Sequence, residues 1–243
     1  MSFVVTQSQR EKAIPVIYRL HRWFFTATIV LGTATTCAMV ATNPGYYSSQ
    51  TGAAALLATT ATASPAMVQA YLLLQVIAFY LLPLGLLTMA WLAMRRAPWL
   101  ASIGAFLIIL GMLPLPAFSA LEALNADVAQ MGSNPLLISL ALRLSSDGVM
   151  SFYNIVDVPG IVFGPALIGI ALWRARAVPI WAAVLITFSR LTVFLFPLFP
   201  SLPGIYLQFP SCVLLFIGSI PAALAVLKTQ YQENLEVVMD MQG

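Results

Sequence analysis

The chain has 243 residues, of which 60% are hydrophobic and only 8% are charged. This composition leaves too little polar surface for a water-soluble domain, so it predicts a polytopic membrane protein. The net charge of +3 comes from a few short basic clusters in apolar sequence. We therefore exclude nucleic acid as a partner and expect membrane lipids instead.

Six stretches are long and apolar enough to cross a membrane, since a helix needs roughly 20 such residues to traverse about 30 Å of hydrocarbon. Their unbroken apolar runs favour helices over barrel strands, whose residues alternate in polarity. The predicted fold is all-α, a six-helix transmembrane bundle that forms a single membrane domain over residues 1–243. The expected spans are 17–41, 67–94, 98–121, 149–173, 179–199 and 205–227, followed by a cytoplasmic tail over 229–243.

The direction of the spans follows from the basic residues, because Lys and Arg beside a span are retained in the cytoplasm. Nine of the eleven fall on one side of the predicted bundle: Arg10, Lys12, Arg19, Arg22, Arg95, Arg96, Arg174, Arg176 and Lys228. The tryptophans lie beside these clusters, as expected for indole rings at the headgroup level. We therefore expect a multi-pass protein of the cell membrane with both termini in the cytoplasm.

A similar short motif, a basic residue followed by proline, precedes the first, third and fifth spans: Lys12-Ala13-Ile14-Pro15, Arg96-Ala97-Pro98 and Arg176-Ala177-Val178-Pro179. Proline in the first helical turn loses no hydrogen bond, and the cation holds the turn in the cytoplasm. One interpretation is the ordinary composition of inner loops. The other is three copies of a helical hairpin, as some carriers have.

Polar residues recur through the fourth span. Arg143, Asp147, Asn154 and Asp157 stand at offsets that a continuous helix would place on one face. Charges inside a membrane cost several kcal/mol unless they are paired or hydrated, so we treat these residues as pocket candidates. Asp147 is also placed to cap the span, because Ser145-Ser146-Asp147 precedes it.

Asp157 and Arg190 are expected at matching depths, roughly 12 Å below the outer surface, on adjacent antiparallel helices. Two interpretations are open: an ion pair that only fastens the two helices, or part of a functional site. Gly160 and Gly164 continue the polar face inward with a spacing that lets a second backbone approach closely.

Glu122 follows a kink expected at Pro114 and Pro116, and Asp127 comes a turn later. A carboxyl group in an apolar setting can act as a general acid. Glu122 and Asp157 are therefore the catalytic candidates, as proton donor and cation stabiliser, for chemistry like that of membrane terpene cyclases. The alternative is that Glu122 and Asp127 are solvated charges of the outer segment 122–148.

The sequence lacks the residues that several kinds of site require. A single histidine, His21, cannot supply a bis-histidine haem or a histidine-rich metal site, and no nucleotide-binding glycine loop is present, so we expect no cofactor and no metal. Cys37 and Cys212 fall toward the outer ends of their spans. They are interpreted as free packing thiols, with a disulfide as the alternative.

The runs Arg95-Arg96-Ala97-Pro98-Trp99-Leu100-Ala101-Ser102-Ile103-Gly104 and Ala171-Leu172-Trp173-Arg174-Ala175-Arg176-Ala177-Val178-Pro179-Ile180-Trp181 resemble those of uncharacterised six-pass bacterial membrane proteins of the actinobacterial type. The resemblance covers roughly residues 70–195. It implies a six-pass fold and an acidic residue at the position of Glu122, and it brings no activity, substrate or cofactor.

The expected function is to bind or move an amphipathic or hydrophobic small molecule in an outward-opening polar pocket between spans three, four and five. Six spans are few for a carrier, so this interpretation favours a homo-oligomer. One alternative is a membrane-embedded acid–base enzyme acting on an isoprenoid or lipid-like substrate. Another is a structural or immunity-type subunit of a larger membrane complex. The sequence leaves open whether the protein is an enzyme.

Overall fold

The computed structural model describes residues 7–48, 53–131, 134–199 and 201–240, and every regular element in those ranges is helical. The elements are α1 (Gln7–Thr42), η1 (Pro44–Tyr47), α2 (Ala53–Thr62), α3 (Pro65–Met94), α4 (Pro98–Met112), α5 (Leu115–Gln130), α6 (Pro135–Ser145), α7 (Gly148–Arg174), α8 (Ile180–Ser189), η2 (Leu191–Leu198) and α9 (Ile205–Asp240). The elements η1 and η2 are 3₁₀-helices.

Five helical segments in the described ranges are long and apolar enough to cross a membrane: Leu20–Thr42, Pro65–Met94, Pro98–Gln130, Gly148–Arg174 and Ile205–Lys228. The prediction of an all-helical protein with several membrane-length helices is therefore confirmed. The stretch 179–199, expected as a single span, is divided between α8 and η2, and α8 alone is shorter than a crossing.

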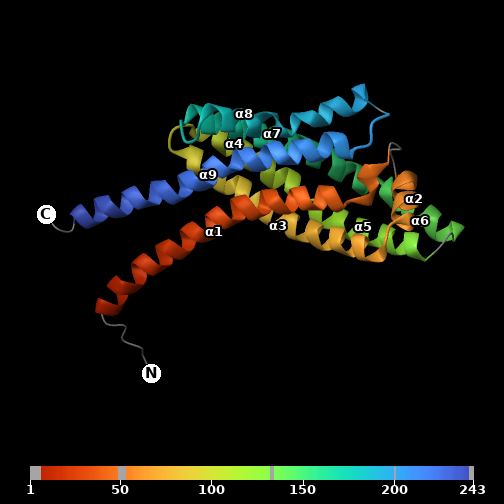
Figure 1. Ribbon diagram of the computed structural model, residues 1–243, viewed down its shortest axis with the longest axis horizontal. Helices are drawn as coiled ribbons and strands as arrows, with labels where there is room; N and C mark the ends of the chain where they lie inside the picture. Colours follow the sequence, from red (N-terminus) through yellow and green to blue (C-terminus); the bar gives the residue numbers. More distant parts are fainter. Residues whose placement is uncertain (1–6, 49–52, 132–133, 200, 241–243) are drawn as a thin grey trace.

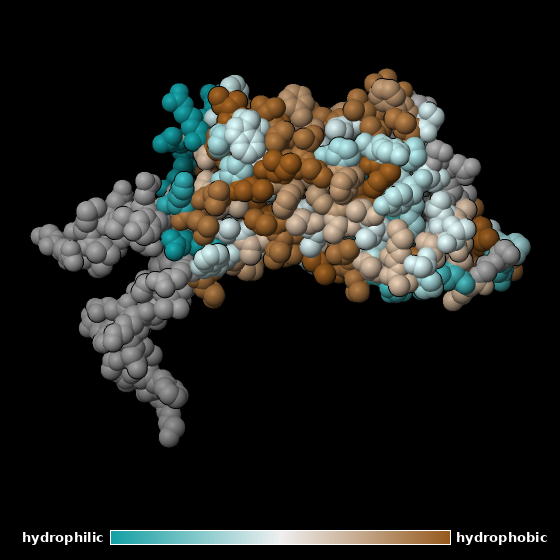
Figure 2. Space-filling model, in the orientation of Figure 1, coloured by the Kyte–Doolittle hydropathy of each residue, from teal (hydrophilic) through white to brown (hydrophobic). Residues whose placement is uncertain are grey.

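The helices pack side by side in one bundle, with α1 against α3 and α9, α4 against α7, and α8 against α7 and α9. The α3–α4 and α7–α8 turns lie at the same end of the bundle as the start of α1 and the end of α9, on the left in Figure 1. The short helices α2 and α6 lie at the opposite end. Hydrophobic side chains cover the middle of the face seen in Figure 2, and the most hydrophilic ones gather at the left end.

Small residues bring α4 and α7 into backbone contact. A methyl group added to Gly160 would lie 2.4 Å from the Cα of Gly111, and one added to Gly164 would lie 2.6 Å from Cγ1 of Ile108. At Gly160 no other residue fits, because a Cβ atom would overlap the backbone of α4, and at Gly164 the Ile108 side chain would have to move. The expectation that Gly160 and Gly164 let a second helix approach is confirmed, and α4 is that helix.

Two of the expected continuous helices are interrupted. The kink expected at Pro114 and Pro116 is a break, since α4 ends at Met112 and α5 starts at Leu115. The continuous helix expected from Arg143 to Asp157 is wrong, because α6 ends at Ser145 and α7 starts at Gly148.

The second break shows in the backbone hydrogen bonds at the end of α6. The amides of Ser146 and Asp147 donate to the carbonyls of Arg143 and Leu144, three residues back, so the last turn tightens, while the hydroxyls of Ser145 and Ser146 donate to the carbonyls of Ala141 and Leu142 at 2.9 and 3.0 Å. Asp147 occupies the N-cap position of α7, as the sequence predicts, but its side chain makes no capping hydrogen bond.

Candidate binding cavity

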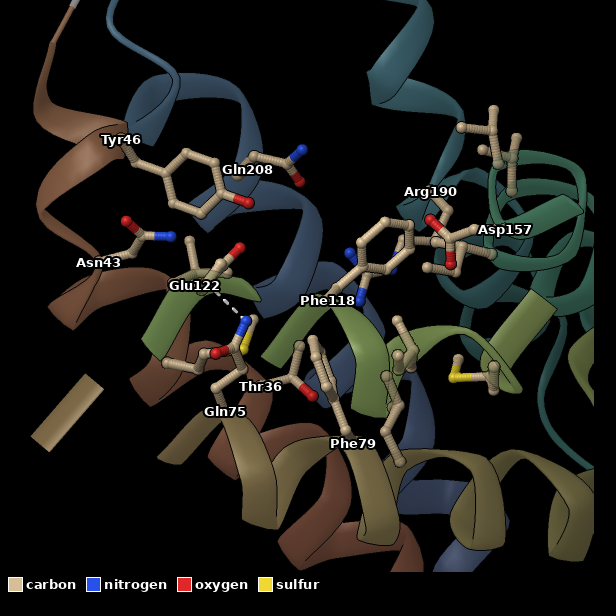
Figure 3. A pocket seen from close by; sticks show the side chains of 18 of the residues that line it. Thr36, Asn43, Tyr46, Gln75, Phe79, Phe118, Glu122, Asp157, Arg190 and Gln208 are labelled. Atoms are coloured by element: carbon tan, nitrogen blue, oxygen red, sulfur yellow. Dashed lines mark hydrogen bonds between the residues drawn. The ribbon is translucent and has the colours of Figure 1, made fainter. Parts of the chain in front are cut away.

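A cavity of about 390 Å³ lies inside the bundle, within the size range of small-molecule sites in proteins. Its wall is built from α1, η1, α3, α4, α5, α7 and α9, together with Arg190 at the C-cap of α8. Figure 3 shows the polar side chains of this wall converging from separate helices. The lining residues are Thr36, Met39, Val40, Asn43, Tyr46, Tyr71, Gln75, Phe79, Leu82, Met112, Leu115, Phe118, Glu122, Asn154, Asp157, Val158, Ile161, Val162, Arg190 and Gln208.

Two side chains of α3 hold the carboxylate of Glu122 in place. Its Oε2 atom accepts a hydrogen bond from the hydroxyl of Tyr71 and a second one, 2.7 Å long, from Nε2 of Gln75 (Figure 3). Tyr71 and Gln75 are four residues apart in α3 and therefore share one helix face. Both residues are buried, so the carboxyl group is positioned by donors that are themselves fixed by packing. Glu122 is thus part of the bundle interior and is not a solvated loop charge.

Asp157 and Arg190 lie close together in the same cavity wall (Figure 3). The positive charge of Arg190 acts on the Asp157 carboxylate, but Oδ1 of Asp157 is buried and has no hydrogen-bond partner. The sequence predicts that these two residues converge, and the structure brings them together. The direct ion pair that one interpretation expected is not among the contacts of the described residues, so one oxygen of the carboxylate is left without a partner.

The position of Arg190 follows from the interruption of the helix at the end of α8. The carbonyl of Ser189 leaves the helical pattern there and instead accepts hydrogen bonds from the hydroxyls of Ser211 and Thr192, the latter at 3.2 Å. Such side-chain donors replace the backbone bonds of an interrupted helix inside a membrane. The interruption sets Arg190 at the junction of α8 and η2.

The two cysteines meet behind Arg190. Cys37 on α1 and Cys212 on α9 lie near enough for their thiols to interact, and the charge of Arg190 acts on both. Both cysteines are free, as the first interpretation of the sequence expected. Arg190 therefore interacts with the Cys212 thiol and also lines the cavity.

The remaining predicted residues divide into two groups. Asn154 lines the cavity, and its Nδ2 donates to the carbonyl of Met150 at 3.0 Å. Asp127, Arg143 and Asp147 are exposed and do not line it. The helix is interrupted at residues 146–147, so Arg143 lies on α6 and does not share a helix with Asp157. Asp147 stands at the exposed N-cap of α7. Neither residue therefore belongs to the expected stripe.

The pocket expected between spans three, four and five also draws on α1, η1, α3 and α9. Sequence reasoning missed six polar lining residues: Thr36, Asn43, Tyr46, Tyr71, Gln75 and Gln208. Gln75 and Tyr71 carry a signal, since they are polar residues at helical spacing inside a stretch without charges. Burial, and then the nearby Glu122 carboxylate, raise the pKa of the Tyr46 phenol above its usual value, so Tyr46 is a neutral group at neutral pH.

Half of the cavity wall is apolar. The rings of Phe79 and Phe118 line it beside aliphatic side chains, and Phe118 packs edge-on against Tyr153 with ring centroids 6.4 Å apart. A wall with a few polar groups among apolar ones suits an amphipathic organic molecule. Among the residues that the structure describes, no group of three or more His, Cys, Asp or Glu residues is arranged to hold a metal ion.

Comparisons with known proteins add no relative to this description. No protein-family model, no curated protein and no solved structure matches the chain.

Proposed function

We propose that this protein is a six-pass cell-membrane protein that binds or moves an amphipathic small molecule through its central cavity. The observation that carries the proposal is the cavity wall, in which Glu122, Asp157 and Arg190 stand among apolar side chains inside a helical bundle. Charged groups at such positions are costly and are kept where they contact a ligand, an ion or each other.

The sixth crossing in this proposal is formed by α8 and η2 together. The ten residues of α8 rise about 15 Å, and the eight residues of η2 rise about 16 Å in the longer step of a 3₁₀-helix. Their sum matches the hydrocarbon thickness of about 30 Å.

An even number of crossings also agrees with the arrangement of the bundle. The start of α1 and the end of α9 lie at one end, next to the turns that carry Arg95, Arg96, Arg174 and Arg176 (Figure 1). Retention of these cations in the cytoplasm would place both termini inside and the α2–α6 end outside. The same arrangement has three successive hairpins, α1 with α3, α4–α5 with α7, and α8–η2 with α9, and this is the pattern that a threefold repeat requires.

Photolabelling tests the binding function. The purified protein is placed in lipid nanodiscs and irradiated with a decanol that carries a diazirine, and labelled residues are identified by mass spectrometry. We expect label on cavity residues, and we expect Val158→Trp to lower that labelling at least about tenfold by filling the cavity.

Ile155→Trp is the matched control. Ile155 lies one turn earlier on α7, is 70% exposed and does not line the cavity, so this variant should label as the parent protein does. Label confined to lipid-facing residues, or equal labelling of both variants, would contradict a binding cavity.

A second candidate function is acid–base catalysis, because Glu122 and Asp157 line one cavity whose wall is half apolar. Lipid extracts of cells with and without the protein distinguish the two functions. An enzyme produces a new isoprenoid or lipid-like product that disappears in Glu122→Gln, whereas a binding or transport protein leaves the extract unchanged.

A further inference from the structure

The charges in the cavity wall do not balance. Glu122 and Asp157 are acidic, and Arg190 is the single basic residue among the described lining residues. With both acids ionised, the cavity therefore has a net charge of −1. Because an uncompensated charge inside a membrane protein is costly, this surplus favours one positive charge in the cavity, either a proton on a carboxylate or a cationic ligand.

The hydrogen-bonding groups of the wall are unbalanced too, because acceptors are left without donors. Two buried polar atoms of the wall have no partner, Oε1 of Gln75 and Oδ1 of Asp157, and both are acceptors. Gln75 is only 2% exposed, and its Nε2 already donates to Glu122, so its oxygen is left without a donor. A buried acceptor without a donor is costly, which favours a ligand that donates hydrogen bonds.

The apolar part of the wall selects among cations. An inorganic ion gains nothing from Phe79, Phe118 and the aliphatic residues, because these side chains offer no oxygen ligand. An organic cation gains from these same groups, because its hydrocarbon part is buried and its charged end can lie against aromatic rings.

We propose that the ligand of this cavity is a protonated amphipathic amine that exchanges with a proton held by the carboxylates of Glu122 and Asp157. This inference rests on the proposed binding function. The exchange is balanced, since one ammonium ion enters the protonated site and one proton leaves for solvent. The other titratable groups around the two acids are Tyr46 on η1, Tyr71 on α3, Arg190 after α8, and Cys37 and Cys212 on α1 and α9.

Competition for the photolabelled site tests the proposal. Decylamine, decyltrimethylammonium, decanol and decanoate share one hydrocarbon chain and differ in the head group, and each is added to the diazirine decanol in nanodiscs. We expect decylamine to displace the label at a concentration at least about tenfold lower than decanol or decanoate. Decyltrimethylammonium should be weaker than decylamine, because it has no N–H group for Gln75.

The pH dependence has a defined sign. Protons compete with the ammonium for the carboxylates, so decylamine should compete less well as the pH falls from about 8 to about 5, while the amine itself stays protonated. Decanol should show no such change. Glu122→Gln and Asp157→Asn should each remove the advantage of decylamine over decanol and its pH dependence.

Asp127→Asn is the control, because Asp127 lies on the same helix as Glu122, is exposed and does not line the cavity. Equal competition by decylamine and decanol in the parent protein, or an amine advantage that survives both cavity substitutions, would overturn the amine proposal and leave the binding function standing. Absence of cavity labelling by the neutral probe would instead contradict the binding function itself.

Discussion

Asp157 and Arg190 influence each other through the interior of the protein, although one lies in α7 and the other at the end of α8. Opposite charges in a poorly polarisable environment stabilise one another, and removal of one leaves the other uncompensated. The two residues should therefore behave as a unit in mutational experiments.

We predict that Asp157→Asn and Arg190→Gln each destabilise the protein more than the double variant does. The coupling free energy should fall between about 0.5 and 3 kcal/mol, as measured by unfolding in mixed micelles of increasing SDS content. Asp127→Asn combined with Arg190→Gln is the control pair and should be additive. Additivity of the Asp157 pair would show that the two charges do not interact.

The sequence predicts part of this site for a clear reason. Charged residues inside apolar stretches are rare, so Asp157 and Arg190 stand out in the sequence, and Glu122 stands beside a proline break. Tyr71 and Gln75 were missed because their role depends on the neighbouring helix: only the packing of α3 near α5 turns them into donors to Glu122.

At the scale of single elements, the contact between α4 and α7 depends on the absence of side chains. Gly160 and Gly111 face each other so closely that any Cβ atom would push the helices apart. Since α7 carries Asn154 and Asp157, the spacing of these two helices also sets the width of the cavity.

We predict that Gly160→Ala lowers the free energy of unfolding by about 1–3 kcal/mol, which is the usual cost of overpacking. The same SDS titration measures it. Gly148→Ala is the matched control on the same helix, because nothing lies within 4 Å of the added methyl group. That variant should be neutral or slightly stabilising, and equal losses in both variants would contradict the close crossing.

The boundaries of the helices are harder to predict from the sequence than their presence. The length of the apolar stretches predicts where membrane-length helices lie, and it located the five that the described residues contain. It does not predict that α6 ends at Ser145, or that the Ser211 hydroxyl bonds the Ser189 carbonyl where α8 is interrupted, because both depend on local hydrogen bonds that hydropathy does not contain.

At the scale of the whole molecule, the number of crossings determines the side on which each end of the chain lies. Five crossings would put the termini on opposite sides, and six would put them on the same side. The basic turns, the start of α1 and the end of α9 lie at one end of the bundle, which favours six (Figure 1).

Reporter fusions in a bacterial host decide between these topologies. We predict that green fluorescent protein fused after residue 243 is fluorescent, since it folds only in the cytoplasm. Alkaline phosphatase inserted within residues 49–52 should be active, since it needs the oxidising exterior. An active phosphatase at the C-terminus together with a fluorescent N-terminal fusion would indicate five crossings.

The cavity wall has consequences for biogenesis, because it takes Thr36 from the first crossing and Gln208 from the last. During synthesis the early helices enter the bilayer well before their final neighbour has been translated. Glu122 and Asp157 must therefore remain in a partly open bundle, where water or the insertion machinery shields them from acyl chains. We expect a nascent chain arrested before α9 to lack the part of the wall that Gln208 supplies, and so to leave the cavity open at the side where α9 packs against α1.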